Sequence, residues 1–125
     1  MSKARELTPG DDMPRFRTNE RIRRRAEYQH IYDRGIRTPG RYLTMFTLSN
    51  NLPVGRLGIA ASRKLGGAIE RNRAKRLIRE VFRRNKLAPG FDIVVIPKRE
   101  LLDASLNTLE TEFRNTLERS LRRHR

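Results

Sequence analysis

The first half of the chain shows one helical segment and two strand-like segments. Apolar residues at helical spacing predict a short helix over residues 25–34, for which Gly35 offers a left-handed stop. Residues 38–40 are typical of a turn. Strand-forming residues predict strands over 42–48 and 56–61, and the break at Asn50–Pro53 between them favours pairing as a hairpin.

The second half predicts two amphipathic helices around one buried strand. A helix over residues 68–85 carries one apolar stripe, made of Ala74, Leu77, Ile78, Val81 and Phe82. The β-branched run at 91–96 predicts a strand covered on both faces and ended by Pro97. Asn107 and Glu110 resemble a capping box at the start of a last helix. Its apolar stripe consists of Leu106, Leu109, Phe113, Leu117 and Leu121.

The predicted element order is α-β-β-α-β-α, which describes one small α+β domain. A length of 125 residues fits a single domain. The first fourteen residues show no apolar period and contain two prolines, so we expect a mobile tail there. We therefore predict a mobile tail over residues 1–19 and one folded domain over residues 20–125.

The charge is strongly positive and unevenly distributed. The chain has 29 Lys and Arg against 14 Asp and Glu, a net charge of +15. Residues 15–99 hold 22 basic and 6 acidic residues, whereas residues 100–125 hold 5 of each. A surplus concentrated in the middle of the chain indicates a surface for a polyanion such as nucleic acid. Arg outnumbers Lys by 24 to 5, which suits phosphate binding but also follows from a GC-rich genome.

The predicted helix at 68–85 holds the densest basic run. Residues 70–86 contain eight basic and two acidic residues. At about 100° per residue, four of the basic side chains gather opposite the apolar stripe: Lys75, Arg76, Arg79 and Arg83. The preceding loop adds Ser62, Arg63, Lys64 and the Gly66–Gly67 pair, whose backbone allows close approach to phosphate. A merely solvated surface helix is the alternative, but compensating acids are nearly absent.

Composition argues against several other classes of protein. There is no cysteine, which excludes a disulfide framework, a thiolate nucleophile and Cys-ligated zinc. Glu70 and Glu80 lie about three helical turns apart and cannot share a metal ion. His30 and His124 are the only histidines, and we interpret both as bystanders to any chemistry. We therefore expect no catalytic residue. With no apolar stretch of about 20 residues and no signal core, we expect a cytoplasmic protein without membrane contact.

Residues 58–80, GIAASRKLGGAIERNRAKRLIRE, closely resemble the signature of the bacterial ribonuclease P protein subunit. That family carries the pattern Gly-x-Ala-Val-x-Arg-Asn-Arg-x-Lys-Arg-x-x-Arg behind a Ser-Lys-Lys-like strand end. Inside the pattern the single departure is Ile69 for Val. The resemblance extends more loosely over about residues 20–120. It implies an α/β sandwich of a ribosomal-protein type with a left-handed βαβ crossover, against the usual right-handed preference.

The resemblance also implies a function, that of an accessory to a catalytic RNA. In the family, the RNA uses Mg²⁺ to cleave the 5′ leader from precursor tRNA, and the protein supports RNA structure, metal affinity and leader binding. It implies no tightly bound cofactor on the protein and no obligate protein partner. Positions matching the family pattern are implied contacts with the catalytic RNA: Arg71, Asn72, Arg73, Lys75, Arg76 and Arg79. Arg83 extends this face by helical geometry rather than by the pattern.

A second implied surface is a cleft that holds the single-stranded leader. The matching positions are Tyr28, Tyr32 and Phe46, together with Ser62, Arg63 and Lys64 at the end of a strand. Flat aromatic rings suit single strands because stacking tolerates any base. Without the resemblance, core packing is the more ordinary interpretation of the three rings. The rival hypothesis for the whole chain is a structural RNA-binding protein such as a ribosomal protein, which needs no exposed leader platform.

Overall fold

The computed structural model describes residues 18–125, and the part of the predicted tail before Thr18 lies outside them. A mixed sheet of four strands has the order β1-β2-β4-β3. Its strands are β1 (Ile36–Pro39), β2 (Leu43–Ser49), β3 (Arg56–Ile59) and β4 (Phe91–Pro97). Its helices are α1 (Arg25–Arg34), α2 (Ala68–Arg84) and α3 (Leu106–Arg122). Short 3-10 turns lie at Thr18–Glu20, Arg63–Leu65 and Arg99–Asp103.

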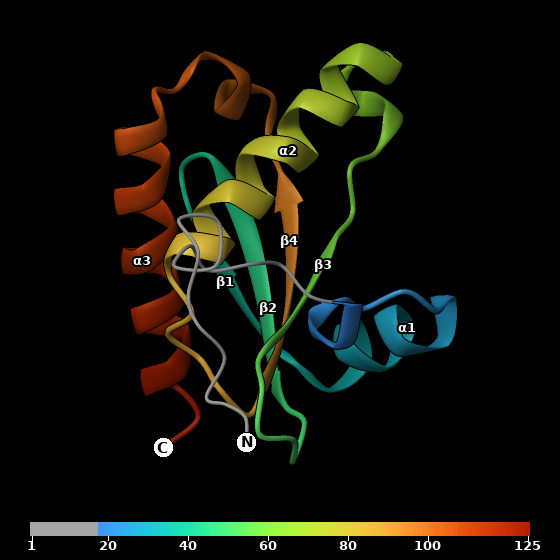
Figure 1. Ribbon diagram of the computed structural model, residues 1–125, viewed down its shortest axis with the longest axis vertical. Coiled ribbons are helices and arrows are strands. Elements are labelled where there is room, and N and C mark those ends of the chain that lie inside the picture. The colour runs from blue at the N-terminus through green and yellow to red at the C-terminus, as the bar shows by residue number, and fades with distance from the viewer. Residues whose placement is uncertain (1–17) are drawn as a thin grey trace, which may run out of the picture.

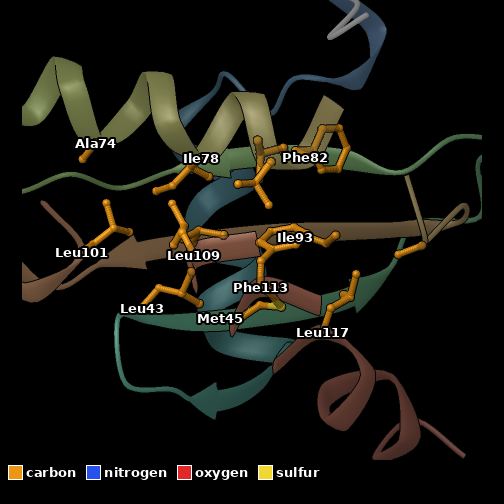
Figure 2. Close-up of a cluster of buried hydrophobic side chains, with 14 of the residues drawn as sticks. Leu43, Met45, Ala74, Ile78, Phe82, Ile93, Leu101, Leu109, Phe113 and Leu117 are labelled. Atoms are coloured by element: carbon orange, nitrogen blue, oxygen red, sulfur yellow. The ribbon is translucent and has the colours of Figure 1, made fainter. Parts of the chain in front are cut away.

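The two faces of the sheet receive different helices because side chains alternate along each strand. Along β2, Leu43 and Met45 point into the larger core, whereas Phe46 and Leu48 point to the opposite side. The larger core is formed with α2 and α3, and Figure 2 shows Ile78, Phe113 and Leu117 from these helices around Met45 and Ile93. The smaller cluster on the other side joins Ile31 of α1 to Val94 of β4. The domain is therefore a sheet between α2 and α3 on one face and α1 on the other.

The predicted fold class is confirmed, and so is the βαβ unit. β3 and β4 lie side by side in parallel and are connected through α2. In Figure 1, α2 lies in front of the sheet, both strands run upward, and β4 lies to the left of β3. This is the left-handed arrangement that the resemblance implied, because a right-handed crossover would place β4 on the other side.

The predicted hairpin is wrong, and one strand was missed. β2 does not pair with β3, because β4 lies between them and pairs antiparallel with β2. The hairpin is instead formed by β1 and β2, with Ile36 opposite Thr47 and Pro39 opposite Thr44. The first two residues of the turn predicted at 38–40, Thr38 and Pro39, belong to β1. An edge strand tolerates proline, since the side that lacks an N–H can face away from the sheet.

Two predicted helix ends also differ from the structure. Gly35 ends α1 in an extended conformation with φ −77°, not a left-handed one. The space around it explains the glycine, because a Cβ there would lie 2.5 Å from the carbonyl oxygen of Ile31. At α3 the N-cap is Ser105, whose hydroxyl accepts from the N–H of Thr108, rather than the predicted Asn107.

Candidate nucleic-acid interface

The basic side of α2 lies on the surface because its opposite side is used for packing. Ala74, Ile78, Val81 and Phe82 are buried in the larger core, as the predicted stripe requires, while Leu77 is only partly buried. A helix with such a stripe turns its remaining side chains to solvent. Among the predicted RNA contacts, Asn72, Arg73, Arg76 and Arg79 are exposed, and Lys75 is partly exposed.

Two of the predicted contacts are engaged within the protein. Arg83 donates to both carboxylate oxygens of Glu80 at 2.6 and 2.7 Å, and Arg84 donates to the same group at 2.8 Å. These hydrogen bonds, above all that from Arg83, hold the pKa of Glu80 below its usual range. Arg71 donates to the carbonyl oxygen of Gly66 at 3.0 Å and so supports the loop before α2. Among the predicted contacts with the catalytic RNA, the exposed arginines are therefore Arg73, Arg76 and Arg79.

The glycine pair before α2 serves the helix cap. Gly66 has φ +144°, a conformation that L side chains rarely adopt. The N–H of Gly67 donates to the carboxylate of Glu70 at 2.9 Å. The backbone N–H of Gly67, one of the two glycines predicted to allow close approach to phosphate, is thus engaged by a side chain of the helix itself. Next to this cap, Ile69 is 81% exposed, so an apolar side chain projects from the start of the basic helix.

The three aromatic residues among the predicted leader contacts form one row of half-buried rings on the α1 side of the sheet. The ring centroids of Tyr28 and Tyr32, one turn apart on α1, are 6.4 Å apart. The Tyr32 ring meets the edge of the Phe46 ring at 5.1 Å, from the neighbouring strand β2. We call Tyr28, Tyr32 and Phe46 the aromatic row. Burial raises the pKa of both tyrosines.

Tyr28 is the most firmly fixed ring of the row. Its hydroxyl accepts from the N–H of Ile59 at 3.1 Å and donates to the carbonyl oxygen of Ile22 at 3.4 Å. The ring lies against Gly58, where a Cβ would come within 2.7 Å of the tyrosine oxygen. Because its hydroxyl is occupied, Tyr28 can offer a ring face or edge more readily than a hydrogen bond.

Ser62, Arg63 and Lys64 are exposed in the turn between β3 and α2. Ala60, two residues before Ser62, packs in the same small cluster as the aromatic row. This turn therefore connects the side of the sheet that carries the rings to the start of the basic helix.

A pocket of about 270 Å³ is lined both by Tyr28 of the aromatic row and by Lys75 and Arg79 of α2. Gly58 and Ile59 of β3 also line it. Sequence reasoning missed two further cationic lining residues, Arg21 and Arg23. They are brought there because Arg21 bridges to Leu57 along the outer edge of β3. The sequence signal for them is the four arginines among residues 21–25.

The two histidines differ in their surroundings. His30 is exposed on α1. His124 lies within 2.8 Å of the hydroxyl of Thr47, which in turn lies 2.5 Å from that of Ser120. Its ring also meets the edge of Phe91 with 5.0 Å between centroids. His124 thus attaches the end of α3 to β2.

Neither a metal site nor a membrane span is present in the part of the chain that the structure describes. Within residues 18–125, no three His, Cys, Asp or Glu side chains gather closely enough to hold a metal ion. No helix among these residues is long and apolar enough to cross a bilayer.

The fold and the surface together define a small basic α+β domain that presents a cationic helix beside a row of aromatic rings. Comparison with known proteins gives the family. The family model for ribonuclease P matches residues 16–121. The chain is 32% identical over 108 residues to the ribonuclease P protein component of Clostridioides difficile, covering 84% of this chain and 95% of the relative. It is 43% identical over 88 residues to that of Thermotoga maritima, covering 69% and 75%. The chain therefore belongs to the ribonuclease P protein family.

Solved structures agree with this assignment. The RNase P protein from Thermotoga maritima superposes with a TM-score of 0.74 at 38% identity, covering 80% of this chain and 96% of that one. The RNase P protein of Staphylococcus aureus gives 0.72 at 34% identity, covering 79% and 93%. The family resemblance of residues 58–80 is thereby confirmed, whereas the roles of individual site residues stay predictions.

Proposed function

We propose that this chain is the protein subunit of a ribonuclease P ribonucleoprotein. In this function it binds the catalytic RNA and the 5′ leader of precursor tRNA. It assists the Mg²⁺-dependent hydrolysis that removes the leader and so makes the mature 5′ end of the tRNA. The observation that carries the proposal is the pocket lined by Lys75 and Arg79 of α2 and by Tyr28 of the aromatic row, in a chain of this family.

The exposed side of α2 is the proposed contact with the catalytic RNA. Arg76 and Arg79 project from a helix whose far side is buried, so the helix can approach a phosphate backbone without unfolding anything. Each phosphate that a cation neutralises releases condensed counterions, which supplies affinity and makes it salt-dependent. Guanidinium groups suit this contact because they bind phosphate through two parallel hydrogen bonds.

The aromatic row is the proposed platform for the leader. A single strand exposes its bases, and stacking on an aromatic side chain contributes about 1–3 kcal/mol per base with little sequence preference. Tyr32, in the middle of the row, is held between Tyr28 and Phe46, so its ring is already ordered before any base arrives. Preordering lowers the entropy lost on binding.

Cleavage itself is assigned to the RNA. Among the described residues the acids are dispersed or paired with arginines, as Glu80 is with Arg83 and Arg84. Protein-only phosphodiester hydrolysis usually relies on carboxylates that hold metal ions or on a general acid and base. We therefore propose that the RNA-containing holoenzyme uses the Mg²⁺, while this chain contributes binding and orientation.

The test is reconstitution of cleavage. The protein is mixed with a bacterial ribonuclease P RNA at low Mg²⁺, and 5′ cleavage of a precursor tRNA is timed against RNA alone and protein alone. Rapid cleavage only in the mixture supports the proposal. Binding to the RNA without any gain in cleavage contradicts it and favours the rival, a structural RNA-binding protein such as a ribosomal protein.

The leader platform has its own test. Tyr32→Ala should weaken binding of precursor tRNA to the holoenzyme by about tenfold or more, since one stacking contact is lost. Affinity for mature tRNA should be unchanged, because mature tRNA has no leader. Tyr42→Ala is the matched control, since Tyr42 packs against the larger core instead of joining the aromatic row. Equal losses for both tRNAs would contradict a leader platform at Tyr32.

A further inference from the structure

A network of ionic hydrogen bonds connects α1 to β3 and β4. Arg56, the first residue of β3, donates from Nε and Nη2 to the two carboxylate oxygens of Asp92 at 2.8 and 2.7 Å. Its remaining nitrogen, Nη1, donates to Oε2 of Glu27 on α1 at 3.0 Å. Asn50 also donates to Asp92, at 2.9 Å. One planar guanidinium thus spans two carboxylates that belong to different elements.

Glu27 fixes the start of α1 with its other oxygen. Its Oε1 accepts from the N–H groups of Arg23 and Arg24 at 3.3 and 3.2 Å, which lie just before the first turn. Burial alone would raise the pKa of Glu27, but these N–H groups and the Arg56 guanidinium outweigh burial and lower it. The ionised carboxylate therefore caps α1 and attaches it to the sheet at the same time.

The attachment point adjoins the aromatic row. Tyr28 follows Glu27 directly on α1, and Gly58 lies two residues after Arg56 on the same side of β3. Tyr28 fits closely against Gly58 and accepts from the N–H of Ile59. The position of the Tyr28 ring thus depends on the separation between α1 and β3, and Arg56 spans this separation.

The network has the properties of a positioning device more than of a source of stability. Arg56 is 20% exposed and Asp92 8%, so both groups lose much of their hydration on folding. In such pairs the lost hydration offsets most of the attraction, while the geometric requirement remains strict. A displacement of α1 relative to β3 would also displace the ring of Tyr32, because this ring contacts both Tyr28 and Phe46.

We propose that Arg56 is a positioning residue, which holds α1 against β3 and thereby sets the aromatic row in place for a single-stranded RNA leader. This inference rests on the proposed function, because it assigns a role to a residue that does not itself belong to the row. The mechanism acts through Glu27 and Asp92, so changes at either carboxylate should have the same effect as changes at Arg56.

Glu27→Gln is the most informative variant. It removes a negative charge, so electrostatics alone would strengthen binding to any RNA. Positioning requires the opposite, since the neutral amide no longer pairs with the Arg56 guanidinium. The amide oxygen of glutamine can still accept from the N–H groups before α1, and the cap is preserved. Glu118→Gln, at an exposed position on α3, makes the same change of charge away from the network and is the matched control.

Arg56→Lys is the complementary variant. It keeps the positive charge, and an ammonium group cannot reproduce the planar fork that reaches Asp92 with two nitrogens and Glu27 with a third. If Arg56 acted on RNA only through its charge, this variant would bind like the wild type. As a positioning residue, it should lose affinity along with Glu27→Gln.

The experiment measures the affinity of reconstituted holoenzyme for precursor tRNA and mature tRNA, with Tyr32→Ala included. We expect Glu27→Gln and Arg56→Lys each to lower affinity for precursor tRNA about tenfold, with mature tRNA unchanged. Tyrosine ring signals in NMR spectra of the free protein should show Tyr28 displaced in both variants. A merely stabilising role would change the unfolding midpoint and leave both readouts at wild-type values.

Two results would overturn the inference in distinguishable ways. If Tyr32→Ala abolishes the preference for precursor tRNA while Glu27→Gln behaves like Glu118→Gln, then leader binding stands and positioning by Arg56 is wrong. If Tyr32→Ala has no effect on that preference, the proposed leader platform is itself wrong, and the role of Arg56 falls with it.

Discussion

Gly58→Ala tests how closely α1 is seated on the sheet. Gly58 is buried on β3, and an added Cβ would lie 2.7 Å from the hydroxyl oxygen of Tyr28 and 2.8 Å from its Cζ. These separations are shorter than carbon atoms tolerate, so the Tyr28 ring must move away. Movement would break the hydrogen bond in which Ile59 donates to Tyr28 at 3.1 Å.

The magnitude follows from three contributions. Overpacking a well-packed site costs about 1–3 kcal/mol. Loss of one hydrogen bond adds about 0.5–1.5 kcal/mol. Replacing glycine by alanine within a strand returns about 0.5–1 kcal/mol, because the unfolded chain has less freedom to lose. Together these contributions predict that Gly58→Ala lowers the free energy of unfolding by about 0.5–4 kcal/mol, with a central value of about 2 kcal/mol.

Urea unfolding followed by circular dichroism is the assay, applied to a double-mutant cycle with Tyr28→Ala. When the ring is absent, the added methyl group meets nothing from Tyr28, and Gly58→Ala should be neutral or slightly stabilising. The coupling between the two positions should therefore approach the full loss seen in the wild-type background. An equal loss in both backgrounds would refute the reasoning, because the strain would then come from somewhere other than Tyr28.

Three further predictions concern the core, the basic helix and pH. Phe113→Ala should lower the free energy of unfolding by about 3–5 kcal/mol in urea titrations, since Phe113 is fully buried; a loss below about 1 kcal/mol would contradict its place in the core. Arg76→Gln and Arg79→Gln should each reduce the slope of log affinity for the catalytic RNA against log salt by about 0.7–0.9, with Arg122→Gln as the unchanged control. The pKa of Glu27 is lowered on folding, so its stabilisation is present above the usual carboxyl pKa and is lost as pH falls through the lowered value. Glu27→Gln should therefore lose less stability than the wild type between pH 7 and pH 3, and an identical decline would show that Glu27 does not carry this dependence.

The helices were predictable because the forces that define them are local. The predicted range 25–34 coincides with α1, and 68–85 exceeds α2 by a single residue. In both cases the apolar period lies within the segment and a glycine lies directly beside it. The basic side of α2 could be predicted for the same reason, since one helix presents all of its residues at a fixed angle. The family resemblance could be recognised for a similar reason, because it depends on the contiguous residues 58–80, which include most of α2.

The strand pairing could not be obtained in this way. No local sequence pattern predicts that β4 lies between β2 and β3. Strands pair across long separations in the chain, and the order of the strands depends on how the shared core is packed. The sequence pattern did not predict the edge strand β1, because this strand has only four residues and contains Pro39. Its pairing with β2 becomes evident only when the sheet is assembled.

The surface shows the same division between sequence and tertiary structure. Sequence and family resemblance alone identified the residues of the aromatic row and of the basic helix. Tertiary structure alone brings Arg21 and Arg23 to the pocket beside Tyr28, and it alone joins Arg56 to Glu27 and Asp92. Arg56 lies 29 residues from Glu27 and 36 residues from Asp92 in the chain. The sequence determines which side chains each helix and strand presents. The packing of α1 on β3 and β4 decides which of these side chains contact each other, because contacts between distant elements form only when the assembled core places those elements side by side.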